Sequence, residues 1–392
     1  MPRPAPTTHR APRRRGTLRG LTTALAWEFA LVVIALVALL WRPTGLYLAG
    51  GLLVLLLVVG LPVVRGRSLL SLLASRWRFV RRRRARVTDP GDMPVDLVPL
   101  AQWVPGLQVN QTRSAQGHDV GVVTDGESWT AILALATDDA LLSDSGERVD
   151  LDALKGLTRQ DDIVFAGLQL VTYTVPAPVQ ALLRPDSVAA KAYLELSGGD
   201  VPPAVRRTWI CVRLDPRLCL EAVARRGASN DGIYATLRFG LHRVQAALKR
   251  QGIITRALSP MEIYEVLSFT TGSTPDHAAD RSSESWTTWS CDGLVHSGRQ
   301  VRSWGDNTSL GYQSLLQTLD RTPVLFAVSS YTVDADSRVT GGVRLVTPTT
   351  AAAQQAQQHL SAALDRSVKL AAPGGAQVPA VLATVPLGRP VA

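Results

Sequence analysis

Two apolar stretches dominate the pattern of hydrophobic and polar positions near the start of the chain. Residues 21–41 and 44–64 are each 21 residues long, and only Arg42 and Pro43 separate them. At about 1.5 Å of rise per residue, a helix of that length covers about 30 Å, the thickness of the hydrocarbon core of a bilayer. The pattern therefore predicts a transmembrane hairpin of two antiparallel helices.

Arginines flank both outer sides of this predicted hairpin. Six precede residue 21 and nine lie between residues 65 and 86, whereas Arg42 alone lies between the two stretches. Because cytoplasmic flanks of spanning helices are enriched in Lys and Arg, we predict a multi-pass protein of the inner (cell) membrane. Its N-terminus and its large C-terminal domain are expected in the cytosol.

Glu28 is the only acidic residue in the first 87 positions. It falls about 9 Å inside the first predicted span, where a carboxylate is costly unless its charge reaches the headgroups or meets a partner. Two interpretations stay open: Glu28 extends to the cytosolic headgroups, or it makes a polar contact with the helix of a partner subunit.

Apolar residues recur at helical spacing directly after the hairpin and predict a basic juxtamembrane helix over residues 65–87. The run Arg81, Arg82, Arg83, Arg84 closes it, and Trp77 lies one turn earlier. One role for these residues is attraction to anionic lipid headgroups, worth about 1 kcal/mol per basic side chain near the surface. The other is docking of a partner subunit, and the two roles are compatible.

Strand-like and helix-like patterns then alternate through residues 88–347 and predict one cytosolic mixed α/β (α+β) domain. Strands are expected at 120–124, 128–136, 163–175, 208–214, 285–291, 294–304, 323–333 and 338–346, and helices at 150–157, 216–226, 232–251, 261–267 and 309–320. Asp125-Gly126 predicts a hairpin turn, and Ser259-Pro260 predicts a helix start. Residues 89–117 are expected to be irregular. Residues 1–20 are expected to form a basic disordered tail, and 348–392 an Ala/Gln-rich helix followed by a disordered tail.

The charge of the chain is unevenly distributed. Residues 1–87 hold 16 of the 42 Lys and Arg residues, so the remainder has 26 basic against 31 acidic side chains, a net charge of −5. The high pI therefore describes the N-terminal segment, and a nucleic-acid partner is not expected. Three cysteines without a CxxC pair favour free thiols over a disulfide framework.

Several short runs in the middle of the chain resemble a known family. They are Arg-Arg-Thr-Trp-Ile-Cys-Val-Arg-Leu-Asp-Pro at 206–216, Ala-Val-Ala-Arg-Arg-Gly at 222–227, the helix with Leu237, Arg243, Val244 and Leu248, and Ala-Leu-Ser-Pro-Met-Glu-Ile at 257–263. In this order, with the arginine-rich segment before them, they resemble EccE, a membrane component of actinobacterial type VII (ESX) secretion systems.

This resemblance implies a subunit of an inner-membrane secretion complex, assembled with the ATPase EccC and with EccB and EccD. It also implies a domain whose fold has been likened to glycosyltransferases without an established reaction. The function expected is that of a structural subunit that stabilises the assembly through its spans and its cytosolic domain. The residues expected to contact membrane or partners are Glu28, Trp77, Arg81, Arg82, Arg83 and Arg84.

Catalytic motifs give little support to an enzyme. None of the four lysines follows a glycine, so the phosphate-binding loop of a nucleotide hydrolase is absent from the sequence. Asp334-Ala335-Asp336 after an apolar run could hold a metal against a sugar nucleotide, which gives the alternative of a membrane-associated sugar-nucleotide transferase. The same residues also suit a polar hairpin turn. We therefore expect no catalytic residue, no cofactor and no metal.

Overall fold

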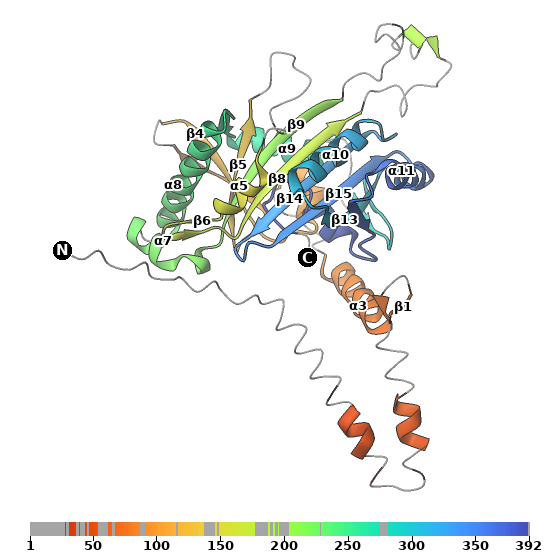
Figure 1. Ribbon diagram of the computed structural model, residues 1–392. Helices are drawn as coiled ribbons and strands as arrows, with labels where there is room; N and C mark the ends of the chain where they lie inside the picture. Colours follow the sequence, from red (N-terminus) through yellow and green to blue (C-terminus); the bar gives the residue numbers. More distant parts are fainter. Residues whose placement is uncertain are drawn as a thin grey trace, which may run out of the picture. The chain divides into compact units, whose positions relative to one another are not determined.

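The computed structural model describes most of the chain after residue 66 (Figure 1). The described stretches are 67–86, 93–114, 117–136, 149–176, 204–227, 229–274 and 281–390, with short pieces before residue 67 and a few single positions elsewhere. The chain divides into two compact units, Met1–Arg78 and Phe79–Ala392. Each is considered by itself below.

The first unit contains a small antiparallel pair of strands and the start of a helix. Strand β1 (Pro62–Val64) pairs with β2 (Arg67–Ser68), and α3 (Leu69–Ala85) follows directly. In the part of this unit that the structure describes, helical residues otherwise occur mainly at 31–36 and 47–53. The basic helix predicted after the apolar stretches is thus present.

The predicted transmembrane hairpin needs correction. Among the residues that the structure describes, no helix has both the length and the apolar character needed to cross a membrane. Many positions of 21–41 and 44–64, and the predicted tail 1–20, lie outside the described residues.

An antiparallel sheet of twelve strands forms the centre of the second unit. Its strands are β3 (Gln108–Arg113), β4 (Asp119–Thr124), β5 (Trp129–Leu135), β8 (Gly167–Val175), β9 (Val205–Leu214), β10 (Thr255–Ala257), β11 (Ser282–Glu284), β12 (Trp289–Cys291), β13 (Leu294–Trp304), β14 (Phe326–Asp334), β15 (Val339–Thr347) and β16 (Val368–Ala371). The order is β11-β12-β13-β15-β14-β8-β9-β5-β4-β3, with β10 beside β5 and β16 beside β13. A separate pair joins β6 (Arg159–Gln160) to β7 (Ile163–Val164).

Every pairing among these described strands is antiparallel. The domain is therefore an antiparallel sheet with added helices, and the expected mixed α/β, glycosyltransferase-like arrangement is wrong. The strand runs were mostly placed correctly by their periodicity, but periodicity gives no information on the direction in which distant strands pair.

Helices cover both faces of the sheet (Figure 1). One face carries α5 (Leu151–Gly156), α7 (Leu220–Arg226), α8 (Ser229–Arg250), α10 (Thr308–Asp320) and α11 (Thr350–Ala363). The other carries η1 (Val95–Leu97), α4 (Val98–Ala101), α9 (Pro260–Thr271) and α12 (Gln377–Leu382). A short η3 (Pro216–Leu218) precedes α7. Because both faces are covered, strands such as β8 and β14 are buried along almost their whole length.

The alternation of side chains along each strand separates two hydrophobic cores. On β8, Leu168 and Leu170 belong to the core under α8 and α10, whereas Val171 and Tyr173 belong to the core under α9 and α12. This follows from the two-residue period of a strand, which sends successive side chains to opposite faces.

Local sequence signals explain how several elements begin. The Asp125 carboxylate accepts hydrogen bonds from the backbone N–H groups of Glu127 (3.3 Å) and Ser128 (3.0 Å), which fixes the β4–β5 turn at Asp125-Gly126. Helix α9 starts with a capping box, in which the Ser259 hydroxyl accepts from the Glu262 N–H and the Glu262 carboxylate accepts from the Ser259 N–H. Both features confirm their predictions.

The C-terminal segment differs from the expected disordered tail. Strand β16 pairs with β13, and α12 packs on the sheet with Val378 and Val381 buried. Further on, the Gln169 side chain donates to the Ala383 carbonyl (2.7 Å), and its carbonyl oxygen accepts from the Gly388 N–H (2.8 Å). A composition rich in Ala, Gly and Pro was misleading, because the apolar residues that recur every three or four positions are enough to bury the segment.

Residues 89–117 also contain more structure than expected. Within the described part of that segment, η1 and α4 pack with Leu97 and Leu100 fully buried, and β3 forms the edge of the sheet. These elements place the residues that form the pocket described next.

Candidate functional site

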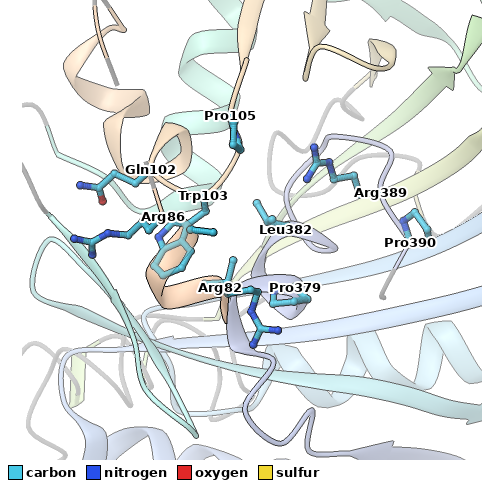
Figure 2. A pocket seen from close by; sticks show the side chains of 11 residues that line it. Arg82, Arg86, Gln102, Trp103, Pro105, Pro379, Leu382, Arg389 and Pro390 are labelled. Carbon is cyan, nitrogen blue, oxygen red and sulfur yellow. The ribbon is translucent and has the colours of Figure 1, made fainter. Parts of the chain in front are cut away.

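A pocket of about 350 Å³ lies where three segments of the second unit meet (Figure 2). The end of α3 contributes Arg82 and Arg86, the turn after α4 contributes Trp103, and the C-terminal segment contributes Leu382 and Arg389. Prolines 105, 379 and 390 also line it. The pocket therefore combines apolar walls with three guanidinium groups, one of which belongs to the predicted arginine run.

Arg82 is bound to the domain by a buried carboxylate. Its guanidinium donates to both carboxylate oxygens of Glu284, at 3.1 Å and 3.4 Å, and also donates to the Gly375 carbonyl. The Glu284 side chain is fully buried, and it also accepts from the Val378 N–H (2.9 Å) at the start of α12. Glu284 thus connects α3, β11 and α12.

Arg86 continues this attachment one helical turn later. Its guanidinium donates to the Ser282 carbonyl (2.8 Å) and lies 5.8 Å from the centre of the Trp103 ring. The indole N–H of Trp103 donates to the Ser282 hydroxyl (2.7 Å), which in turn donates to the Gln102 side-chain carbonyl (2.6 Å). These contacts fix β11 against the turn after α4.

The arginine run divides between two faces of α3. Phe79, Arg82 and Arg86 follow each other at helical spacing and are half-buried against the domain, where Phe79 meets the edge of Trp286. Arg81, Arg83 and Arg84 lie on the exposed part of the helix. Arg83 also places its guanidinium 5.8 Å from the centre of the Phe79 ring. The sequence alone does not distinguish the four arginines, whereas the structure shows that Arg82 is half-buried and the other three are exposed.

Arg389 belongs to a second cluster at the edge of the pocket. The Asp125 carboxylate accepts from Arg389 (2.5 Å) and from Arg213 (2.7 Å). Burial raises the pKa of Asp125, but the charges of the two arginines outweigh burial and lower that pKa overall. This carboxylate therefore stays ionised and attaches the C-terminal segment to β9.

The other two residues expected to contact partners belong to the first unit. Glu28 lies in a helical position and is exposed, and Trp77 lies on α3 with 63% of its surface exposed. Neither residue lines the pocket.

The aspartates of the alternative metal site lie in a hairpin turn. The Asp334 carboxylate accepts from the N–H groups of Asp336 (2.9 Å) and Arg338 (2.8 Å), in the turn between β14 and β15. This matches the interpretation as a polar turn. Across the described ranges, no group of three or more His, Cys, Asp or Glu residues is placed to hold a metal ion.

A buried arginine on β15 has no counterpart in the sequence predictions. Arg344 is fully buried and donates to the Thr270 carbonyl (2.5 Å) and lies 3.3 Å from Nδ1 of His296. No carboxylate within the described residues forms an ion pair with it. Burial lowers its pKa to about 9, so it stays charged at neutral pH, whereas burial and the charge of Arg344 lower the pKa of His296 well below its usual value. In the sequence, the burial of Arg344 is indicated only by its position in a predicted strand, between the apolar residues Val343 and Leu345.

The three cysteines are free, as the sequence predicted, and all three are buried. Burial raises the pKa of the Cys211, Cys219 and Cys291 thiols, to about 12 for Cys291. Because the thiolate is the reactive form, none of these side chains has the character of a nucleophile.

Comparison with known proteins agrees with the resemblance noted from the sequence. No curated protein matches the chain. A family model covers the part of the domain from just before β9 into β13, including α8, α9 and Glu284, the ion-pair partner of Arg82. Residues 202–300 match the model described as "Putative type VII ESX secretion system translocon, EccE", so this part of the chain is similar to that family.

Proposed function

We propose that this chain is a structural, non-catalytic subunit of the type VII secretion translocon, and that it stabilises the assembly by binding other subunits through the exposed face of α3. The observation that carries this proposal is the division of the arginine run. Arg82 and Arg86 attach the helix to the domain, so Arg81, Arg83 and Arg84 are presented on a helix that is fixed in place.

Fixing the helix matters for binding energy. A mobile helix would lose conformational freedom on binding, and this loss would reduce the affinity. A helix that is already packed through Phe79, Arg82 and Arg86 avoids much of that loss. Its exposed guanidinium groups then suit an acidic surface, for which arginine offers several donors in a rigid plane.

The partners in this proposal are the subunits that the resemblance implies, EccB, EccC and EccD. We include Trp77 and Glu28 among the partner-contact residues, since both are exposed on helical segments of the first unit. Anionic lipid headgroups form the competing partner for the same arginines, because the phosphate groups offer similar acceptors. We infer that the chain belongs to a membrane complex, because residues 202–300 match the model of a secretion-system translocon component.

The test reverses the three exposed charges. Full-length protein carrying Arg81→Glu, Arg83→Glu and Arg84→Glu is purified in mild detergent, and the co-purifying translocon subunits are quantified. We expect their recovery to fall by about tenfold or more, since each reversal replaces attraction by repulsion across the contact. Recovery at the level of the unmodified chain would contradict the proposal.

A matched control separates local charge from total charge. Arg250→Glu, Arg338→Glu and Arg366→Glu change the net charge equally at three exposed positions elsewhere on the domain. We expect this variant to retain the partner subunits. If the α3 variant keeps its subunits but no longer binds vesicles containing an anionic lipid, the arginines serve the membrane and not the assembly.

A further inference from the structure

A second and larger concavity lies between α8, β10 and the β3–β4 hairpin. Its volume is about 1350 Å³, and it shares no lining residue with the α3 pocket. Figure 1 shows α8 beside β4 and β5 at that edge of the sheet. We call it the α8 groove.

The groove exists because the sheet divides at this edge. Strand β5 pairs with β4 only from Trp129 to Ala131, and from Leu133 to Leu135 it pairs with β10 instead. The first half of β4 therefore diverges from β5, and the two branches are joined where the Gly121 N–H donates to the Leu258 carbonyl (2.7 Å). The groove thus follows from the way the sheet divides at this edge.

The groove has an apolar floor and an exposed apolar rim. Val120, Leu241 and Ile253 line the floor and are buried. Phe239 and Ile254 also line it, with 45% and 68% of their surfaces exposed. Exposed large apolar residues along a concave surface are typical of an interaction site.

The charges along the groove are unbalanced. Arg113, Arg238, Lys249 and Arg256 line it, against the carboxylates of Asp119 and Glu262. One of these carboxylates is already used, because Glu262 lies 2.6 Å from Arg256.

The remaining cations have no carboxylate partner within the described part of the chain. Arg238 donates to the Thr112 hydroxyl (3.0 Å) and to the Arg113 carbonyl (2.9 Å), both of which are uncharged. Arg113 and Lys249 are exposed and form no ion pair with any described residue. The groove therefore has a local excess of positive charge, although residues 88–392 together have a net charge of −5.

Size and charge together limit what the groove can hold. Pockets for small molecules are typically about 300–1,000 Å³, and this one is larger. A nucleic acid requires a broad positive surface that follows the phosphate backbone, whereas here the positive charge is confined to one groove of an acidic domain. A polypeptide segment with acidic and apolar side chains matches both the cations and the apolar floor.

We propose that the α8 groove is a docking site for an acidic, partly apolar segment of a partner protein. Arg113 and Lys249 receive its carboxylates, and Phe239 and Ile254 cover its apolar side chains. This site is separate from the exposed face of α3, so it does not depend on the role proposed for Arg81, Arg83 and Arg84.

The test cross-links whatever occupies the groove in the assembled protein. A photoreactive benzophenone amino acid replaces Ile254 in the full chain, produced together with the other translocon subunits, and the cross-linked peptides are sequenced by mass spectrometry. We expect peptides from another protein that are rich in Asp and Glu with interspersed apolar residues. The same substitution at Leu310, an exposed apolar position on α10, should not yield these peptides.

Charge reversal then tests the recognition directly. Arg113→Glu with Lys249→Glu should lower the cross-link yield by about tenfold, while Arg250→Glu with Arg338→Glu should leave it unchanged. Lys249→Glu alone, at an exposed position, serves where the double variant folds poorly. Neutral or basic peptides, cross-links within this chain only, or yields unaffected by reversal would each overturn the proposal.

The two proposals fail in different ways. If the groove variants lose no cross-links while subunit recovery still depends on the arginines of α3, the groove is not a docking site and the proposed structural role stands. If the α3 variants retain all subunits while acidic peptides still cross-link at Ile254, the groove is a docking site and the role proposed for the exposed face of α3 is contradicted.

Discussion

The α3 pocket and the α8 groove are both lined by arginines, but their arginines have different surroundings. In the pocket, Arg82 meets a fully buried carboxylate, and Arg389 shares Asp125 with Arg213. In the groove, only Arg256 has a carboxylate partner among the described residues, and that pair is largely exposed. The difference shows that arginines which hold the fold together can be separated from those available to bind a partner.

The physical basis of this difference is desolvation. A buried charge loses its hydration and must be compensated by a partner of opposite charge, so removing one member of a buried pair is costly. An exposed charge stays hydrated, and its pairing contributes little to stability. Pairing and burial therefore indicate which arginines mainly affect stability, and exposure indicates which mainly affect binding.

The largest effect is expected at Glu284. Glu284→Ala leaves the guanidinium of Arg82 and the N–H of Val378 without their acceptor in a buried environment. We expect the free energy of unfolding to fall by about 3 kcal/mol, as measured by chemical denaturation. The matched control is Glu127→Ala, whose exposed pair with Arg217 should contribute little to stability. Equal losses for the two variants would remove the distinction between the two kinds of arginine.

Arg344 extends the comparison to an arginine that is buried from solvent and has no carboxylate partner among the residues that the structure describes. Its neighbour His296 is fully buried and has a pKa well below the usual 6.5, because of burial and of the charge of Arg344. The folded protein keeps His296 neutral, whereas the unfolded chain binds a proton as the pH falls below 6.5. The stability contributed by the neutral histidine is therefore fully present above that pH and is lost on acidification.

We expect the free energy of unfolding to fall as the pH is lowered from 6.5 to about 5, by up to about 1.4 kcal/mol for each pH unit over which the unfolded chain alone binds the proton. Denaturation curves at several pH values measure this loss, and His296→Gln should reduce the pH dependence of the free energy of unfolding. His359→Gln changes an exposed histidine on α11 and should leave the dependence as it was. If His296→Gln has no influence on the pH dependence, the protonation of another group dominates.

The sequence was sufficient for features that depend on neighbouring residues. The helix start at Ser259-Pro260, the turn at Asp125-Gly126, and strand β13 at Leu294–Trp304 all match their predictions. Each depends on residues within a few positions of one another, so the sequence contains all the information that is needed.

The site could be predicted only in part, because it depends on distant residues. The helix period located α3, but which arginines face the domain is decided by Glu284, 202 residues after Arg82. The division of β5 between β4 and β10 leaves residues 119–120 and 255–257 lining the same groove, and no local pattern relates these two segments. The transmembrane prediction was wrong: it was made from the length of two apolar runs, and no helix among the described residues is both long and apolar enough to cross a membrane.

A smaller effect is expected where α8 approaches the sheet and forms one wall of the groove. A Cβ at Gly240 would overlap the ring of Phe165, which is fully buried and has little room to move. Gly240→Ala should lower the free energy of unfolding by about 1–2 kcal/mol, since the steric cost exceeds the gain in helix propensity.

Gly156→Ala is the matched control for Gly240→Ala. Gly156 ends α5, is exposed, and has no atom within 4 Å of an added Cβ. We expect this variant to be as stable as the unmodified chain or slightly more so, from reduced freedom of the unfolded state. If Gly240→Ala were equally well tolerated, α8 would be free to shift, and the groove would not have the fixed shape that docking of a segment requires.

The smallest effect on stability is expected at Lys249, and this is the sharpest test of the contrast between pocket and groove. Lys249 is exposed near the end of α8 and has no ion pair with any described residue, so Lys249→Glu should change the free energy of unfolding by less than about 0.5 kcal/mol. A slight loss is expected, because an acidic residue near the C-terminus of a helix meets the negative end of its dipole. Chemical denaturation beside Glu284→Ala measures the contrast directly. A loss as large as that of Glu284→Ala would mean that Lys249 has a structural role, and would remove the basis for assigning it to a partner.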